Sequence, residues 1–328
     1  MQYYLYKMNK YNNKTNIVIL NYNNAEDTID CIKSILKIDN EEICIVLIDN
    51  ASTNDSVSFL NDWFISKNIK IGKVSYMSDL DTFDVEDRLD SKITFIRVDS
   101  NNGYAAGNNI GIKYVVQNAL EEDYIWILNN DTIINNDTLK NLIKNYNQLE
   151  NENIALLGSK ILNEDLTIQS VGFTTKQYSQ KEIEVLSNVE VEHISGCSVF
   201  FRVKKIKEIG YIPEEYFLYY EETDWMKSIK QKGFKIFTCL SSQLIHKHAK
   251  STGGIYSPFV IYYMTRNQIL FNRKYLNSIE YYLFILKIIN RNLLKIVFYS
   301  FKNLELSKSI FTGTIDGILN KKGKKEFF

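Results

Sequence analysis

The stretch that decides the fold is DYIWILNNDTII, residues 123–134, in which an apolar run ends abruptly on two amides and a carboxylate. A short, continuous apolar run between polar residues is typical of a strand that is buried on both faces of a sheet. In open α/β sheets, ligands bind beyond the carboxyl ends of the strands. The position of Asn129, Asn130 and Asp131 at the end of this run therefore indicates a ligand-binding role for these side chains.

Three earlier stretches repeat this pattern of an apolar run that ends in polar residues. The runs at 16–23, 43–53 and 92–99 end in or are followed by Asn21-Tyr22-Asn23, Asp49-Asn50 and Asn101-Asn102. Because the carboxyl ends of parallel strands lie at one edge of a sheet, all four polar clusters should meet there. The alternative is that Asn and Asp only cap helices and start turns.

Helical spacing of apolar residues separates the strands, at 25–39, 55–67 and 103–120. Strands that alternate with helices predict an α/β fold with a mostly parallel central sheet flanked by helices. The acid-rich stretch 72–92 breaks the alternation and is expected to be an insertion or an irregular loop.

The composition is that of a globular protein, with 328 residues, 45% of them apolar and 24% charged. The chain has 39 basic residues (Lys and Arg) and 39 acidic residues (Asp and Glu), so it carries no net positive charge that would favour a nucleic-acid partner. The four cysteines form no C-x-x-C pair and are expected to be buried free thiols, which suits the cytoplasm. The N-terminus lacks the apolar core of a signal peptide, and no apolar window is long enough to predict a spanning helix.

The motifs, taken in order, resemble the family 2 glycosyltransferases of the nucleotide-sugar-binding GT-A fold, and most of all the bacterial rhamnosyltransferase-like branch. The matching stretches are VILNYNNAEDTIDCIKSIL (18–36), IVLIDNASTNDS (45–56), NNGYAAGNNIGI (101–112), YIWILNNDTII (124–134), GCSVFFRVKKIKEIGYIPEEYFLYYEETDW (196–225) and IHKHAKST (245–252). The resemblance implies a GT-A domain over 1–278, with a nucleotide-binding half at 16–135 and an acceptor-binding half at 150–278, followed by a helical tail at 279–328.

The resemblance also implies a donor site on the first half. Asp131 matches the family's metal ligand in an Asp-x-Asp motif, whose first Asp is Asn129 here, and Asp49 matches the acid that accepts from a pyrimidine N–H. The cofactor expected is Mg²⁺ or Mn²⁺, which stabilises the departing diphosphate. The residues expected to bind the nucleotide sugar are Leu20, Asn21, Tyr22, Asp49, Asn50, Asn102, Gly103, Asn108, Asn129, Asn130, Asp131 and Arg266. Asn50 is equally compatible with a turn-forming role.

The second half is expected to supply the base that deprotonates the acceptor hydroxyl. By the resemblance, Glu222 matches the carboxylate that acts as the base in the family, and Asp224 is the second candidate. The alternative is that acids lie there because they interact favourably with the helix dipole. His246 is expected at the metal or diphosphate, with His248 as the second candidate and a surface pair as the alternative. We expect Asp131 and Glu222 to share one crevice.

The tail has its own pattern. Lys287, Arg291 and Lys295 recur every four residues in the apolar stretch 281–302, so they form one basic stripe on a helix. Such a helix suits the surface of an anionic membrane, and a lipid-linked acceptor at the inner face would explain it. The alternative is a helix that packs on the catalytic domain with a solvated basic face.

The sequence therefore predicts an inverting glycosyltransferase that moves a sugar, with rhamnose from dTDP-rhamnose favoured, to a glycan or lipid-linked acceptor in surface polysaccharide synthesis. Two other classes stay open: a non-catalytic nucleotide-sugar or glycan-binding module, and a nucleotidyltransferase. Against the latter, the loop after the first strand, NYNNAED, is acidic and lacks glycine.

Overall fold

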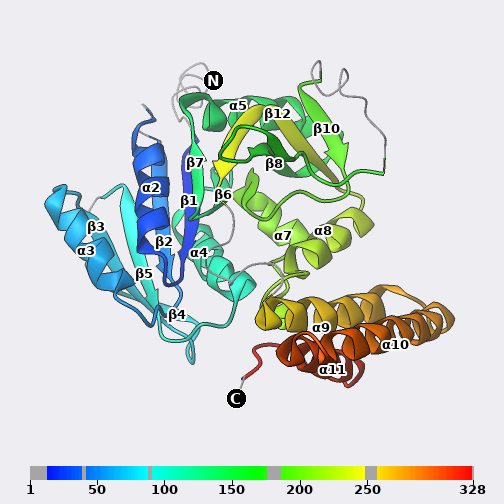
Figure 1. Cartoon of the computed structure of the whole chain (residues 1–328). Coiled ribbons are helices and arrows are strands. Elements are labelled where there is room, and N and C mark those ends of the chain that lie inside the picture. The colour runs from blue at the N-terminus through cyan, green and yellow to red at the C-terminus, as the bar shows by residue number, and fades with distance from the viewer. Residues whose placement is uncertain (1–12, 39–41, 88–90, 176–185, 248–256, 327–328) are drawn as a thin grey trace. The chain divides into compact units, whose positions relative to one another are not determined.

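The structure is a computed structural model that describes residues 13–38, 42–87, 91–175, 186–247 and 257–326. The chain divides into two compact units (Figure 1). Unit 1 comprises Met1–Asn101, Gly107–Tyr211 and Met226–His248, and unit 2 comprises Asn102–Ala106, Ile212–Trp225 and Ala249–Phe328. The described helices include none with both the length and the apolarity needed to cross a bilayer.

Unit 1 is built on one sheet, whose strand order is β10-β12-β8-β11-β6-β1-β2-β5-β3-β4, with β7 on β12 and β9 on β8. The strands are β1 (Thr15–Asn21), β2 (Ile43–Asp49), β3 (Ile71–Met77), β4 (Thr82–Asp87), β5 (Ile93–Val98), β6 (Tyr124–Asn129), β7 (Thr132–Ile134), β8 (Ile154–Leu162), β9 (Ile168–Ser170), β10 (Asn188–Val191), β11 (Ser198–Arg202) and β12 (Lys235–His246). Neighbours β6-β1-β2-β5-β3 are all parallel, which confirms the predicted parallel centre.

The helices of the chain alternate with these strands and then follow them. They are α2 (Ala25–Leu36), α3 (Ser56–Ser66), α4 (Tyr104–Asn118), α5 (Asn136–Gln148), α7 (Ile206–Ile209), α8 (Glu221–Gln231), α9 (Pro258–Tyr275), α10 (Ser278–Ser300) and α11 (Leu304–Ile318), with short 3-10 turns at Glu150–Glu152, Val203–Lys205 and Glu214–Tyr216. Helix α4 lies very close to the sheet, because a Cβ on Gly111 would come within 2.5 Å of Val18 Cγ1. The β1 and β2 strands are almost wholly buried, as their continuous apolar sequences predict.

The described part of the stretch 72–92 is mostly strand rather than the irregular loop that its acidic residues suggested. It contains most of β3 together with β4, an antiparallel pair that extends the sheet, and β3 also pairs in parallel with β5. Val74 and Tyr76 alternate into the core, while the acids of β4 lie on the edge strand of the sheet. Charged side chains on an edge strand discourage pairing with other chains, so an acid-rich sequence there is compatible with a strand.

Unit 2 contains the C-terminal helices, which confirms the predicted helical tail. Figure 1 shows α9, α10 and α11 side by side, and α11 packs closely on α9. A Cβ on Gly313 would lie 2.8 Å from the backbone oxygen of Tyr262, so glycine there allows the two helices to approach. Helix α10 buries only Ile288 and Asn292 fully.

Candidate active site

The polar clusters at the strand ends of unit 1 meet at one edge of the sheet, as predicted. Asn21 at the end of β1 pairs in register with Asp49 at the end of β2, and Leu20 pairs with Asn129 at the end of β6. The amide of Asn50 donates to Asn101 Oδ1 over 3.1 Å, which brings in the segment after β5. The carboxyl edge therefore gathers amides and carboxylates from four strand ends.

Asp49 is held in a fixed orientation at this edge. Its Oδ1 accepts from Asn21 Nδ2 (2.8 Å) and Ser52 Oγ (2.6 Å), and its Oδ2 accepts from Ser52 N (3.1 Å). Asn21 is fixed in turn, because its Oδ1 accepts from Thr28 Oγ1 on α2 over 2.9 Å. A carboxylate oxygen can accept a second hydrogen bond, so Asp49 Oδ2 retains acceptor capacity for a ligand.

The second cluster joins β6–β7 to the end of β12. Asp131 Oδ1 lies 3.2 Å from His246 Nε2, and both side chains are 14% exposed. Among the described residues, no hydrogen-bond donor with suitable geometry reaches Asp131 Oδ1. The backbone joins the same two segments, because Lys247 N donates to Asp131 O over 2.9 Å.

Gln169 on β9 determines which nitrogen of His246 carries the proton. Gln169 Nε2 donates to Asn163 Oδ1 and to the backbone oxygen of His246, so its Oε1 is the atom that faces His246 Nδ1 at 2.9 Å. Nδ1 therefore donates, and in the neutral ring Nε2 carries a lone pair. A lone pair and a carboxylate oxygen 3.2 Å apart repel each other unless a proton or a cation lies between them.

These two atoms fit a divalent cation that takes few ligands from the protein. Imidazole nitrogen and carboxylate oxygen are ordinary ligands of Mn²⁺, and Mg²⁺ usually keeps water and substrate phosphate in its coordination shell. Within the described part of the chain, no cluster of three or more His, Cys, Asp or Glu side chains could hold a metal. Phosphate oxygens or water would have to complete the coordination.

Asn130 and Lys247, the chain neighbours of Asp131 and His246, anchor this cluster to α2. Asn130 Nδ2 donates to Thr28 Oγ1 (2.9 Å) on α2. Lys247 Nζ contacts Asp27 (3.0 Å) and Asp30 (2.9 Å) on the same helix, so its ammonium group pairs with carboxylates. The sequence reasoning missed both acids and Gln169, because 77 residues separate Gln169 from His246 and no local motif marks it.

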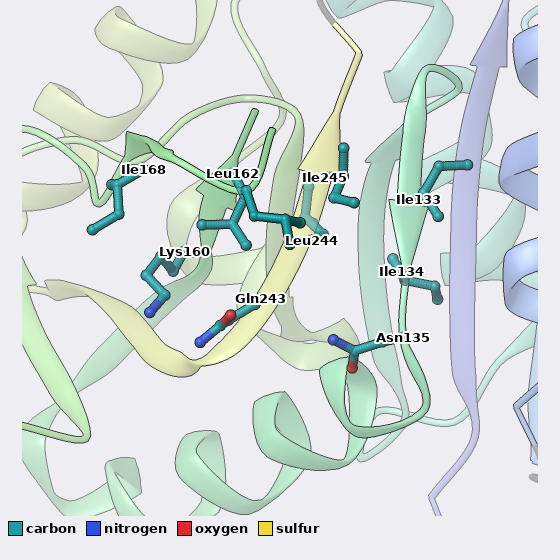
Figure 2. Close-up of a pocket in the computed structure, with 10 residues that line it drawn as sticks. Ile133, Ile134, Asn135, Lys160, Leu162, Ile168, Gln243, Leu244 and Ile245 are labelled. Atoms are coloured by element: carbon teal, nitrogen blue, oxygen red, sulfur yellow. The ribbon is translucent and has the colours of Figure 1, made fainter. Parts of the chain in front are cut away.

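A cavity of about 360 Å³ opens along the same strands (Figure 2). Residues 133–135 of β7 and its end and 243–245 of β12 line it. Figure 2 shows the aliphatic side chains of Leu162, Leu244 and Ile245 close together, with the polar ends of Lys160 and Gln243 to one side. The first residue along the chain that lines this cavity is Ile133, two residues after Asp131, and most of the lining side chains are aliphatic.

The other residues of unit 1 that were expected to bind the nucleotide-sugar donor differ in exposure. Asn108 on α4 is buried, Asn129 is half-buried, and Tyr22 is exposed. Leu20 contacts α4, since a Cβ on Gly107 would lie 2.5 Å from its Cδ1. Their roles toward a nucleotide sugar stay predictions, and His248 lies outside the described residues.

The predicted acids Glu222 and Asp224 lie in the first turn of α8, within unit 2, together with Glu221. Glu221 is buried, and burial and then the neighbouring Glu222 carboxylate raise its pKa well above the usual range. Glu222 is half-buried, and no described residue hydrogen-bonds to its Oε2. Glu221 Oε2 likewise has no described hydrogen-bond partner, and both oxygens are themselves buried. Of the three acids, only Glu222 has a partly exposed side chain.

Asp224 has a different environment. It is fully buried, and Lys274 Nζ lies 2.9 and 2.7 Å from its two oxygens. Tyr216 Oη donates to Oδ2 over 3.0 Å, and Tyr275 Oη donates to Oδ1. This carboxylate ties α8 to α9.

Three further residues that were expected to bind the nucleotide sugar lie in the same unit. Arg266 on α9 is buried, and its guanidinium donates to protein acceptors, the backbone oxygens of Tyr216 and Gly323, both at 2.7 Å. Gly103 has a φ of +101°, and a Cβ there would lie 2.1 Å from the backbone oxygen of Phe217. Asn102 is exposed beside it. Asp131 belongs to unit 1 and Glu222 to unit 2, so the crevice that they are expected to share stays a prediction.

The sequence of the chain is similar to those of known sugar transferases. The family model of glycosyl transferase family 2 matches residues 16–210. The chain is 23% identical to the low-salt glycan biosynthesis hexosyltransferase Agl10 of Haloferax volcanii over 94% of this chain and 92% of that protein. It is 27% identical to the dTDP-rhamnosyl transferase RfbF of Shigella flexneri over 72% of this chain and 82% of that protein.

A solved structure shares the fold. The mannosyltransferase PcManGT of Pyrobaculum calidifontis, in complex with GDP-Man and Mn²⁺, superposes with a TM-score of 0.55 at 11% identity. The match covers 95% of this chain and 89% of that one. The likeness confirms the GT-A fold expected from the motifs.

Proposed function

Because this chain belongs to glycosyl transferase family 2 and is a glycosyltransferase that uses nucleotide-sugar donors, we propose that it transfers rhamnose from dTDP-rhamnose with inversion. The acceptor is a hydroxyl of a glycan or of a lipid-linked saccharide. The 27% identity to a dTDP-rhamnosyl transferase over most of the chain supports this donor.

One observation carries the proposal at the donor end. Asp131 Oδ1 lacks a hydrogen-bond donor among the described residues and faces His246 Nε2 at 3.2 Å, so the two atoms suit a shared divalent cation. When bound, Mg²⁺ or Mn²⁺ supplies electrostatic stabilisation of the departing diphosphate. Gln169 fixes the histidine ring, and Lys247 fixes the strand end by pairing with α2. Asp49 accepts a hydrogen bond from an N–H group of the pyrimidine ring of the nucleotide.

The acceptor end is assigned to Glu222 rather than Asp224. Asp224 has both oxygens engaged by Lys274, Tyr216 and Tyr275, whereas Glu222 Oε2 has no described partner. Glu222 takes the proton of the acceptor hydroxyl, and that oxygen forms a bond to the anomeric carbon. The bond from this carbon to the diphosphate oxygen breaks at the same time, so the nucleoside diphosphate leaves and the configuration inverts.

A thermal-shift screen of nucleotide sugars with Mn²⁺ and with Mg²⁺ tests the donor assignment. The expected result is the largest rise in Tm with dTDP-rhamnose and a metal. A larger rise with a UDP- or GDP-sugar would replace the donor, and no rise with any nucleotide would reject the site.

Glu222→Gln separates the proposal from its alternatives. A transferase with this base should keep the nucleotide-dependent Tm rise and lose release of nucleoside diphosphate by about 10²–10⁴-fold. A non-catalytic binding module would show no turnover in the wild type. A nucleotidyltransferase would instead release or consume pyrophosphate, which an enzymatic phosphate assay distinguishes.

The geometry of α10 supports peripheral association with an anionic membrane, so we include it in the proposal. Large apolar side chains are exposed along one face at helical spacing: Ile279 (73%), Tyr282 (63%), Leu283 (59%), Leu286 (43%), Leu293 (52%), Leu294 (75%) and Val297 (60%). Lys287, Arg291 and Lys295 flank this face, and Glu280 is the one acid of the helix. An apolar stripe beside cations matches the interface of an anionic bilayer.

Flotation with vesicles of phosphatidylglycerol and phosphatidylcholine tests this surface. Leu283→Glu with Leu294→Glu should abolish flotation, because both side chains lie on the exposed face. Ile65→Glu is the matched control, since Ile65 is 76% exposed on α3. Flotation that survives the double substitution would reject the surface, and a shift to monomer on gel filtration would indicate a contact between two copies instead.

A further inference from the structure

The segment between the 3-10 turn Glu214–Tyr216 and α8 adopts an unfavourable backbone conformation. Phe217, Tyr219 and Tyr220 have φ values of +66°, +65° and +79°. Residues with a Cβ disfavour positive φ values, which glycine adopts readily. Three such residues among four cannot hold this shape alone, so neighbouring groups must impose it. We call residues 216–220 the aromatic loop.

One amide on α9 binds the inside of the aromatic loop. Asn267 Nδ2 lies within hydrogen-bond distance of the backbone oxygens of Tyr216 (3.0 Å), Leu218 (2.8 Å) and Tyr219 (2.8 Å). Asn267 is fully buried, so these carbonyl groups have exchanged water for this amide. A primary amide has two hydrogens, so at least one of them is shared between two carbonyl groups.

Arg266 orients that amide and adds a contact of its own. Its Nε donates to Asn267 Oδ1 over 2.9 Å, which turns the NH₂ end of Asn267 toward the loop. One terminal nitrogen donates to Tyr216 O, and the other donates to Gly323 O, both over 2.7 Å. The guanidinium also lies over the ring of Tyr263, 4.8 Å from its centroid. With Nε and both terminal nitrogens engaged in these contacts, Arg266 serves the loop rather than a ligand.

The outside of the loop is bound by the segment that precedes α4. Tyr104 N donates to Phe217 O over 3.0 Å. Gly103 leaves room for this contact, because any Cβ there would overlap the same oxygen at 2.1 Å. The aromatic loop is therefore held from both sides within unit 2.

The loop leads directly into the acidic turn of α8. Tyr220 O accepts from Asp224 N over 2.9 Å, and Lys274 and Tyr275 of α9 fix the Asp224 carboxylate. Both ends of the segment that carries Glu222 are thus attached to α9. We propose that Arg266 and Asn267 are positioning residues that set the place of Glu222 through the aromatic loop. This inference rests on the proposed role of Glu222 as the base.

A double-substitution cycle tests the proposal in the full-length chain. The assay is release of nucleoside diphosphate from the nucleotide sugar chosen by the thermal-shift screen, with water as the acceptor. Asn267→Ala should lower kcat by about 10²-fold, since small misplacements of a catalytic group cost this much, and should leave the KM for the donor within twofold. Asn272→Ala is the matched control, because within the described residues that α9 amide donates only to Gln268 O.

The cycle with Glu222→Gln distinguishes positioning from general damage. If Asn267 acts through Glu222, Asn267→Ala should lower the rate no further in the Glu222→Gln background. A full additional 10²-fold loss there would overturn the inference while leaving Glu222 as the base. An unchanged rate of Glu222→Gln alone would overturn the proposed base instead.

A second variant covers the case in which Asn267→Ala fails to fold. Arg266→Lys keeps the charge but loses the Nε–H that orients Asn267, so it should lower kcat by about tenfold and show the same lack of additivity with Glu222→Gln. Equal effects of Arg266→Lys in both backgrounds would overturn the proposal.

Discussion

Replacing Gln169 with leucine should weaken metal binding without touching a metal ligand. The change removes the acceptor of the 2.9 Å hydrogen bond from His246 Nδ1 and frees the choice of tautomer. It also removes the contacts from Gln169 Nε2 to Asn163 and to the backbone of His246. Loss of such a supporting contact typically costs 10- to 100-fold in metal affinity, or about 1.4–2.7 kcal/mol.

Calorimetric titration of Mn²⁺ into the protein saturated with nucleoside diphosphate measures this loss. Gln117→Leu, an exposed change on α4, is the control and should bind Mn²⁺ as the wild type does. Asp131→Asn should bind more weakly than Gln169→Leu, because it removes the charged oxygen itself. Equal Mn²⁺ affinity in the wild type and Gln169→Leu would refute the argument that Gln169 prepares His246 Nε2 for a cation.

Three further predictions concern stability. Glu221→Gln removes a carboxyl group whose pKa is raised by burial and by Glu222, so in the folded chain this group stays protonated at pH values above its usual pKa of 4.5. The Tm of the wild type should therefore fall relative to that of the variant as the pH rises past 4.5. Two Tm curves that stay parallel would contradict this. Asp316 is buried, but hydrogen bonds from two lysines and Tyr262 outweigh burial and lower its pKa to about 2. Asp316→Asn should therefore lower the free energy of unfolding by about 2 kcal/mol at pH 7. In urea titrations this difference should shrink as the pH falls from 4 to 2, and a difference that stays constant over that range would contradict the lowered pKa. Gly313→Ala should lower the Tm although alanine favours helices, because its Cβ would lie 2.8 Å from Tyr262 O; a higher Tm would show that α11 moves freely.

The sequence predicted the parallel centre of the sheet and the place of its polar edge. The runs that end at Asn21, Asp49 and Asn129 are apolar throughout, so burial on both faces follows from local sequence alone. Their convergence then follows from the direction of parallel strands, which the registers of β1, β2 and β6 confirm.

Contacts between distant segments could not be predicted in this way. The acids of β4 lie on an edge strand, where solvent tolerates charge, so the local pattern resembled a loop. Gln169 and His246 meet only because β9 and β12 both pair with β8. Arg266 stands in a motif that suggested a ligand, yet its guanidinium is occupied by backbone oxygens, which only the packing of α9 on the aromatic loop reveals.

The dependence of donor affinity on Mn²⁺ in the wild type and in Asp131→Asn tests the central assignment most directly. We predict that Mn²⁺ tightens binding of dTDP-rhamnose to the wild type by at least about tenfold and leaves the affinity of Asp131→Asn nearly unchanged. Equal tightening in both proteins would contradict the role given to Asp131 and His246.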